Sequence, residues 1–220
     1  MAAAVRRGAH LVLSGGATPR AAYEHLAEKD VDWAGVVLWW GDERCVPPDD
    51  ERSNYRMTKA ALLDRLSGGG PEVRRVEGER EPSDAADAYR AALREAFGDE
   101  LPRFDFVLMG LGPDAHTASL FPGHDALDER DRSVVAVGEP GLAPWVSRVT
   151  LTPPAFRAAR EMLFLVAGAD KADAVALAFA GEPRRDAPAS LVLPIDGALT
   201  LLLDPAAAAG LPDGVAVSEA

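Results

Sequence analysis

The sequence has a single cysteine, few basic residues for its number of acidic ones, and no long apolar run. Cys45 is the one cysteine in 220 residues, which excludes an internal disulfide framework. No apolar run is long enough for a membrane-spanning helix, and the first residues carry no apolar stretch typical of a signal peptide. We therefore expect a cytoplasmic protein without membrane contact.

The shortage of basic residues also limits the partners. Lysine and arginine number 23 against 35 aspartates and glutamates, which gives a net charge of −12. Because no basic excess offsets the phosphates of nucleic acid, we expect no nucleic-acid partner. An anionic small molecule must instead meet cations placed locally. We expect a monomer or a weak homo-oligomer.

Apolar, strand-like runs alternate along the chain with segments of helical periodicity. This alternation is typical of βαβ units with right-handed crossovers, and 220 residues suffice for a core without disulfides or metals. We predict one α/β domain over residues 1–220, three-layered and Rossmann-like, with a mostly parallel sheet and helices on both faces. The predicted strands are His10 to Leu13, Val36 to Trp40, Phe104 to Met109, Val134 to Val137, Met162 to Ala167 and Leu199 to Leu203. The predicted helices are Pro19 to Glu28, Ser53 to Leu66, Ser83 to Phe97 and Asp170 to Phe179, with Pro19 and Ser83 suited to helix starts, and a short helix from Pro205 to Ala209 before a frayed end.

A glycine-rich loop joins the first predicted strand to the first predicted helix. It contains Ser14, Gly15, Gly16 and Thr18. Paired glycines let backbone amides point at a ligand, and a helix N-terminus adds partial positive charge, so the loop suits a phosphate monoester. It lacks the Gly-Lys-Ser/Thr of a nucleoside-triphosphate loop. The alternative is a glycine turn that only reverses the chain.

Charged residues follow the second predicted strand. Asp42, Glu43 and Arg44 come directly after its last apolar residues and one glycine. An arginine here can bind a phosphate or carboxylate with paired hydrogen bonds, while Asp42 and Glu43 can hold that arginine or act as acid and base. A structural ion pair at the end of the strand is the alternative.

The third predicted strand leads to an Asp-x-His pair, Asp114 and His116. Residues just past the carboxyl end of a parallel strand are where open α/β sheets place their sites, so His116 is a candidate general base. Three other interpretations remain open: a dinucleotide loop beginning at Gly110, a metal site that adds His124, and a buried histidine without catalytic duty. Asp114 inside the loop argues against pyrophosphate binding.

Nucleophilic serine catalysis is disfavoured. Ser14 lies outside any Gly-x-Ser-x-Gly motif, and Ser119 is expected in a helical turn with no identifiable neighbouring base.

Four ordered motifs resemble those of the 6-phosphogluconolactonases, within the glucosamine-6-phosphate isomerase/6-phosphogluconolactonase family. They are Ser14 to Pro19 (SGGATP), Trp40 to Val46 (WGDERCV) with Ser53-Asn54-Tyr55, Gly110 to Gly123 (GLGPDAHTASLFPG) and Arg148 to Thr152 (RVTLT). The likeness continues through Gly168 to Ala172 and Pro188 to Ser190 and so covers nearly the whole chain.

The resemblance implies hydrolysis of 6-phospho-D-glucono-1,5-lactone to 6-phosphogluconate, the second step of the oxidative pentose phosphate pathway, without metal or organic cofactor. It implies an α/β fold similar to glucosamine-6-phosphate deaminase and ribose-5-phosphate isomerase. His116 would take a proton from the attacking water, Asp114 would support the imidazole, and Arg44 would serve the oxyanion or the phosphate. The Ser14 loop, with Arg148 and Lys171, would hold the phosphate, and Asp42 would contact the substrate.

The chain differs from the usual family pattern at two places. The family usually has glycine where this chain has Ala115, which matters if that position needs positive φ. Only nine residues precede His10, so we expect a shortened N-terminal helix and an apolar patch that is exposed or covered by a partner.

A deaminase or isomerase of the related fold is the rival enzyme, but deaminases resemble one another in a glutamate and a tyrosine where this chain has Phe121 and Arg44. A non-catalytic sugar-phosphate sensor is the other rival.

Overall fold

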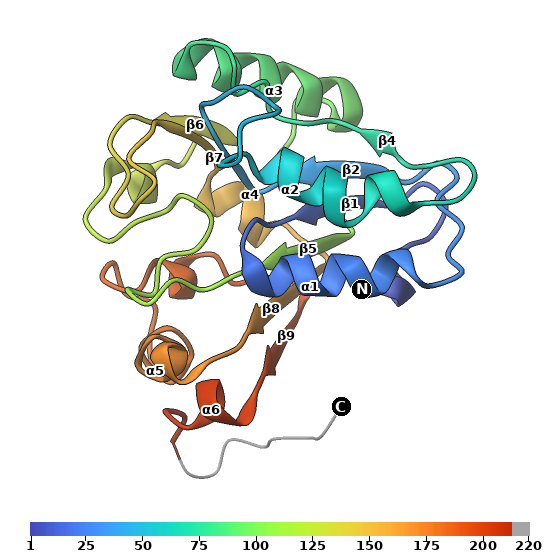
Figure 1. Ribbon diagram of the computed structural model, residues 1–220. Helices are drawn as coiled ribbons and strands as arrows, with labels where there is room; N and C mark the ends of the chain where they lie inside the picture. The colour runs from blue at the N-terminus through green and yellow to red at the C-terminus, as the bar shows by residue number, and fades with distance from the viewer. Residues whose placement is uncertain (213–220) are drawn as a thin grey trace.

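A six-stranded parallel sheet forms the centre of the computed structural model, which describes residues 1–212. The strand order is β4-β2-β1-β5-β8-β9, and every neighbouring pair is parallel (Figure 1). The sheet's strands are β1 (His10–Leu13), β2 (Val37–Trp40), β4 (Glu72–Val73), β5 (Phe106–Met109), β8 (Glu161–Val166) and β9 (Ala198–Leu203).

A second, antiparallel sheet lies beside the first and has the order β3-β7-β6. It consists of β3 (Asp42–Arg44), β6 (Val134–Val137) and β7 (Arg148–Leu151). Because β3 begins two residues after the end of β2, the second sheet starts at the carboxyl edge of the first. This placement brings Arg44 and Arg148 to the edge where parallel sheets form their sites.

Helices cover both faces of the parallel sheet. The apolar core on one face includes residues of α1 (Ala17–Ala27) and α2 (Asn54–Ala61). The core on the other face includes residues of α3 (Pro82–Phe97), α4 (Pro153–Arg157), α5 (Ala172–Phe179) and α6 (Pro205–Ala208). Short 3₁₀ turns complete the chain: η1 (Ala2–Ala4), η2 (Leu63–Arg65), η3 (Asp125–Asp128), η4 (Ala169–Lys171) and η5 (Pro188–Leu191).

Successive residues of β1, β2, β5 and β8 alternate between these two cores. Leu11 and Leu13 pack on the side of α1, whereas Val12 packs on the side of α3. A strand buried on both faces needs apolar side chains at every position, which explains the continuous apolar runs of the sequence. The three-layer α/β prediction is therefore confirmed.

Several details differ from the sequence-based expectations. Val134–Val137 is a strand, but of the antiparallel sheet, since β6 and β7 join through a loop rather than a crossover helix. Ser83 does not cap α3, because Pro82 already occupies its first turn and Glu81 is the N-cap. The helix predicted up to Leu66 ends at Ala61 and continues as η2. The short strands β3, β4 and β7 and the five-residue α4 were not predicted, and the expected frayed end at residues 213–220 lies outside the described residues.

Apolar side chains are exposed along the edge strand β9, where Leu199 and Leu202 are each 40% accessible. Ahead of β1 the chain forms only the short turn η1; a shortened N-terminal helix stays a prediction. Across residues 1–212, no helix has both the length and the apolarity to cross a bilayer.

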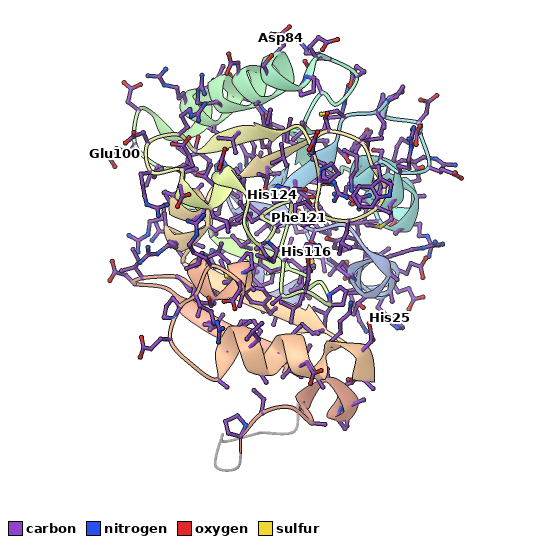
Figure 2. The ribbon with its side chains drawn as sticks, turned by 90° about the vertical axis from the view of Figure 1, so that its left-hand side faces the viewer. His25, Asp84, Glu100, His116, Phe121 and His124 are labelled. Atoms are coloured by element: carbon purple, nitrogen blue, oxygen red, sulfur yellow. The ribbon has the colours of Figure 1, made fainter. Side chains whose placement is uncertain are left out.

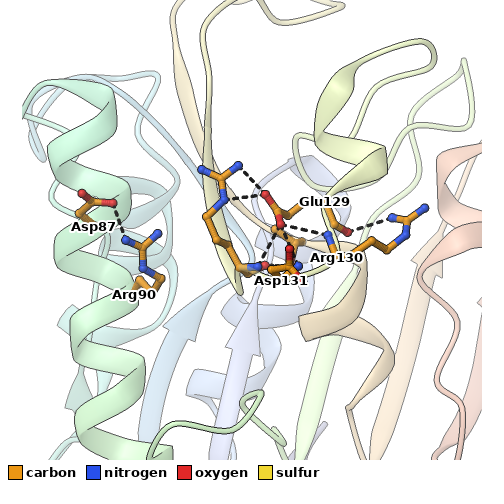
Figure 3. A network of polar contacts seen from close by, with 7 residues as sticks. Asp87, Arg90, Glu129, Arg130 and Asp131 are labelled. Atoms are coloured by element: carbon orange, nitrogen blue, oxygen red, sulfur yellow. Dashed lines mark hydrogen bonds and ion pairs between the residues drawn. The ribbon is translucent and has the colours of Figure 1, made fainter.

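The carboxylate of Glu129 organises the turn just before β6. Its Oε1 accepts hydrogen bonds from the backbone amides of Arg130, Asp131 and Arg132 at 2.9–3.0 Å, and its Oε2 accepts from Arg132 Nε at 2.6 Å (Figure 3). Partial burial raises the pKa of Glu129, but these hydrogen bonds outweigh it and lower the pKa from 4.5 to about 2.

Because the folded pKa of Glu129 lies below its ordinary value, the charged carboxylate stabilises the fold. This contribution is complete above about pH 4.5 and is lost as the pH falls toward 2. We expect Glu129→Gln to reduce the free energy of unfolding at pH 7 by about 1–3 kcal/mol and to flatten its pH dependence in that window. Urea unfolding at pH 7, 4 and 3 measures both, with exposed Glu100→Gln as the control. Equal pH slopes for wild type and Glu129→Gln would contradict this role.

Candidate functional site

A cavity of about 330 Å³ opens at the carboxyl ends of β1, β5 and β8. Its wall combines the loop after β1, the loop after β5, the end of β8 and residues of the second sheet. Nine residues singled out from the sequence lie on this wall: Ser14, Gly15, Gly16, Thr18, Asp42, Arg44, His116, Arg148 and Lys171. The tenth, Asp114, contacts His116.

The glycine loop presents an open helix N-terminus to the cavity. Helix α1 has Gly16 as its N-cap at φ 109°, and no side chain caps its first amides. The hydroxyl of buried Tyr23 holds the loop from behind, donating to the Ser14 carbonyl and accepting from the Ser14 amide, both at 2.9 Å. The free amides and the helix dipole together form an anion-binding arrangement.

His116 and Asp114 form a directly bonded pair in the loop after β5. His116 Nδ1 lies 2.5 Å from Asp114 Oδ1, and the His116 amide donates to the same oxygen at 3.2 Å. Burial raises the pKa of Asp114, but the hydrogen bond and charge of His116 outweigh it, so the pKa lies below its ordinary value. Because a carboxylate only accepts, Nδ1 carries the proton and Nε2 is left as the basic nitrogen.

Two residues of the loop that carries His116 have a strained backbone conformation. Ala115 and Ala118 have positive φ values of 59° and 50°, so position 115 does adopt the left-handed conformation that favours glycine. Ala115 is fully buried and its carbonyl accepts from the Ala189 amide at 3.1 Å, which holds the strained residue in place. Ser119 accordingly lies in a tight turn between Thr117 and Leu120 rather than in a helical turn.

The second sheet places two arginines side by side. Arg44 of β3 is directly opposite Arg148 of β7 in the antiparallel register. Arg148 is only 3% exposed, and one of its terminal nitrogens donates to the Leu142 carbonyl at 2.8 Å. The Nε atoms of Arg44 and Arg148 are both buried without a hydrogen-bond partner. Facing cations with unused donors are unfavourable alone, and anionic oxygens of a ligand would satisfy both.

Burial of the Arg148 guanidinium lowers its pKa below the ordinary arginine value, an effect that the charge of Asp42 partly offsets. Lys171 supplies a third cation from the loop after β8. Its ammonium lies 3.2 Å from the exposed carboxylate of Asp170. The cavity wall thus carries three cations in a chain of strongly negative net charge.

Asn54 is a cavity residue that sequence reasoning did not select. It is the first residue of α2 and is 2% exposed. Its Nδ2 donates to the Asp42 carbonyl at 2.9 Å and to Asp42 Oδ1 at 3.1 Å. The adjacent Glu43 fixes this helix end by accepting from the Asn54 and Tyr55 amides at 2.7 Å. The Ser53-Asn54-Tyr55 motif was the available signal, but no pattern showed that Asn54 faces the cavity.

Phe121 contacts both His116 and Arg148. Its ring centroid is 4.7 Å from that of His116, and the Arg148 guanidinium carbon lies 5.2 Å from the ring centroid. Figure 2 shows His116, Phe121 and His124 following one another at the centre of this face, with His25 at its margin. A carboxylate at position 121 would pair with Arg148, whereas phenylalanine leaves that cation available to a ligand.

Two alternatives left open by the sequence do not match this geometry. Turns rather than a helix follow β5, so the Gly110 loop offers no helix N-terminus to a pyrophosphate. His124 contacts Phe121 at 5.4 Å between ring centroids, and within residues 1–212 no three histidine, cysteine or acidic side chains are grouped as metal ligands would be. Arg44 lines the cavity and donates to the Arg52 carbonyl at 2.6 Å, so a strand-end ion pair does not describe its contacts.

Comparisons with known proteins agree with the four motifs. The family model described as glucosamine-6-phosphate isomerases/6-phosphogluconolactonase matches residues 1–201. A 6-phosphogluconolactonase of Streptomyces coelicolor is 42% identical over 96% of this chain and 85% of its own length. The crystal structure of a 6-phosphogluconolactonase from Thermotoga maritima aligns with a TM-score of 0.79 at 30% identity, covering 90% of this chain and 87% of its own.

A monomeric glucosamine-6-phosphate deaminase also aligns, with a TM-score of 0.81 over 95% of this chain and 91% of its own, but at 21% identity this likeness shows the fold alone. The match of the family model and the 42% identity extend over almost all of the chain. This chain therefore belongs to the glucosamine-6-phosphate isomerase/6-phosphogluconolactonase family.

Proposed function

We propose that this protein hydrolyses 6-phospho-D-glucono-1,5-lactone to 6-phospho-D-gluconate in the oxidative pentose phosphate pathway. Relatives at about 40% identity are named 6-phosphogluconolactonase. The observation that carries the proposal is the pairing of an Asp-supported histidine with buried, unsatisfied arginine donors in one cavity. A phosphorylated lactone needs both a base for water and cations for its phosphate and developing oxyanion.

His116 acts as the general base. Its Nε2 takes a proton from water as the water oxygen forms a bond to the lactone carbonyl carbon, C1. The charge on the carbonyl oxygen of the tetrahedral intermediate is stabilised by Arg44. When the intermediate collapses, the bond from C1 to the ring oxygen breaks, and the imidazolium returns its proton to that oxygen. Asp114 stabilises the transient imidazolium, because it remains ionised and hydrogen-bonded to Nδ1.

The phosphate is held at the other end of the substrate. The free amides at the start of α1, the Thr18 hydroxyl and Lys171 bind the phosphate, and Arg148 adds a buried guanidinium. Anchoring the phosphate fixes the ring relative to His116 and so lowers the entropic part of the barrier. The cytoplasmic location and the oligomeric state stay predictions.

Arg148 provides the direct test. We expect wild-type protein to hydrolyse freshly generated 6-phosphogluconolactone far faster than unphosphorylated glucono-1,5-lactone, with no turnover of glucosamine 6-phosphate. Arg148→Met should lower kcat/KM for the phosphorylated lactone by about 10²-fold or more and leave the unphosphorylated lactone unaffected, since a buried charge partner of the phosphate is lost.

A coupled dehydrogenase assay for 6-phosphogluconate, corrected for spontaneous hydrolysis, measures these rates. Arg103→Met changes an exposed arginine outside the cavity and serves as the control. Saturable binding of the phosphorylated lactone without turnover would favour a sugar-phosphate sensor instead. Deamination of glucosamine 6-phosphate would favour the rival enzyme.

A further inference from the structure

The wall of the cavity carries both donors and acceptors. The donors and cations are the start of α1, Arg44, Arg148 and Lys171. The acceptors are the carboxylate of Asp42 and the side-chain oxygen of Asn54. Asp42 and Asn54 are nearly buried, at 6% and 2% exposure, so these acceptors belong to the interior of the site.

Asp42 is held in one orientation by two donors. Its Oδ2 accepts from the Ser119 hydroxyl at 2.6 Å, and its Oδ1 accepts from Asn54 Nδ2 at 3.1 Å. Ser119 is fully buried and lies behind the cavity wall. An ionised carboxylate has about four acceptor positions, so each oxygen keeps one for a ligand.

The orientation of the Asn54 amide is fixed by the same contacts. Both hydrogens of Nδ2 are used by the Asp42 carbonyl and carboxylate, which requires Oδ1 to point the opposite way, toward Gly15. A Cβ on Gly15 would lie 1.9 Å from Asn54 Oδ1, so the glycine makes room for this oxygen. Within the described residues, Asn54 Oδ1 receives no side-chain hydrogen bond.

Phosphate oxygens are anionic acceptors and are repelled by both groups, whereas sugar hydroxyls are donors. We infer that Asp42 and Asn54 form a hydroxyl-recognising wall that accepts hydrogen bonds from the ring hydroxyls of the lactone. The inference rests on the proposed function and assigns Asp42 to the ring hydroxyls. The phosphate then lies toward Gly16, Thr18, Lys171 and Arg148, and the ring hydroxyls face Asp42 and Asn54.

This wall makes the enzyme select hydroxylated rings. A site built to hydrogen-bond a hydroxyl rejects the analogue that lacks it, because its buried polar groups are left unpaired. We expect at least one of the 2-deoxy, 3-deoxy and 4-deoxy 6-phospholactones to have a kcat/KM at least about 100-fold below that of the parent lactone.

Asn54→Ala tests the inference through the ratio of kcat/KM for the parent lactone to kcat/KM for the deoxy analogue. It should lower kcat/KM for the parent lactone by about 10- to 100-fold while changing that for the discriminated deoxy analogue by less than about two-fold. Ser119→Ala, which alters no residue of the cavity wall, should weaken the same discrimination several-fold by releasing Asp42. Ser83→Ala, on an exposed part of α3, should leave the ratio unchanged.

Equal losses on the parent and every deoxy lactone in both variants would overturn the inference, since they indicate a purely structural role. Wild-type turnover without any deoxy discrimination would also overturn it, while leaving the proposed function in place. Absence of turnover by wild-type protein on every lactone would overturn both. A discrimination ratio that collapses in Asn54→Ala and falls in Ser119→Ala supports the wall.

Discussion

Replacing His116 with alanine is expected to lower kcat/KM for 6-phosphogluconolactone by about 10²- to 10⁴-fold, the usual contribution of a positioned general base. We expect the loss mainly in kcat, because the proposed role of the imidazole is to take a proton from water in the transition state and not to bind the phosphate. The rate of spontaneous hydrolysis limits how small an enzymatic rate the assay can detect. Single-turnover rates at high enzyme concentration, corrected for the uncatalysed reaction, therefore give the cleanest value.

Asp114→Asn is a second variant that tests the Asp114–His116 pair. Asparagine has the shape of the aspartate that lies 2.5 Å from His116 Nδ1. Its amide can, however, present the NH₂ group to Nδ1 and so place the imidazole proton on Nε2. We expect a loss smaller than or equal to that of His116→Ala. The double variant should be little worse than His116→Ala alone, because the two residues act as one unit. Wild-type turnover by His116→Ala would exclude this histidine as the base.

Gly112→Ala is expected to inactivate the enzyme by about 10²-fold or more without unfolding it. A Cβ at this position would lie 1.9 Å from His116 Nδ1 and 2.8 Å from Asp114 Oδ1. The backbone of Gly112 does not have positive φ, so alanine meets no conformational penalty there. The added methyl group must therefore displace the imidazole and break its contact with Asp114.

Activity and thermal unfolding measured together distinguish this local effect from misfolding. Gly138→Ala is the matched control, because a Cβ there meets nothing within 4 Å and the residue lies outside the cavity wall. A Gly112→Ala protein with normal kcat and normal thermal stability would show that the loop adapts and that the histidine is not held by this glycine. Loss of stability equal to the loss of activity would point to folding instead.

Local signals in the sequence were sufficient for the layered fold. Strands β1, β2, β5, β8 and β9 are predominantly apolar, and the helices between them show clear three- and four-residue periodicity. Hydrophobic burial is strongest where a strand is covered on both faces, so these elements are marked in the composition itself. The second sheet was missed, because β3 is three charged residues whose strand conformation depends on pairing with β7.

The site likewise has parts that local sequence predicts and parts that depend on tertiary contacts. The glycine loop and the Asp114–His116 pair are close in sequence to the strand ends that position them, so their location was predictable. Arg44 and Arg148 are separated by 104 residues and become neighbours only through the antiparallel register of β3 and β7. Asn54 enters the cavity because Glu43 binds the first amides of α2.

By itself the sequence determined an α/β protein with a glycine loop and an Asp-x-His pair at strand ends, because period and turn chemistry are local properties. Only the tertiary structure decided which cations face each other, which glycine makes room for the imidazole, and which acceptors line the cavity. Those features depend on contacts between residues distant in sequence, and such contacts follow from packing and register rather than from any local pattern.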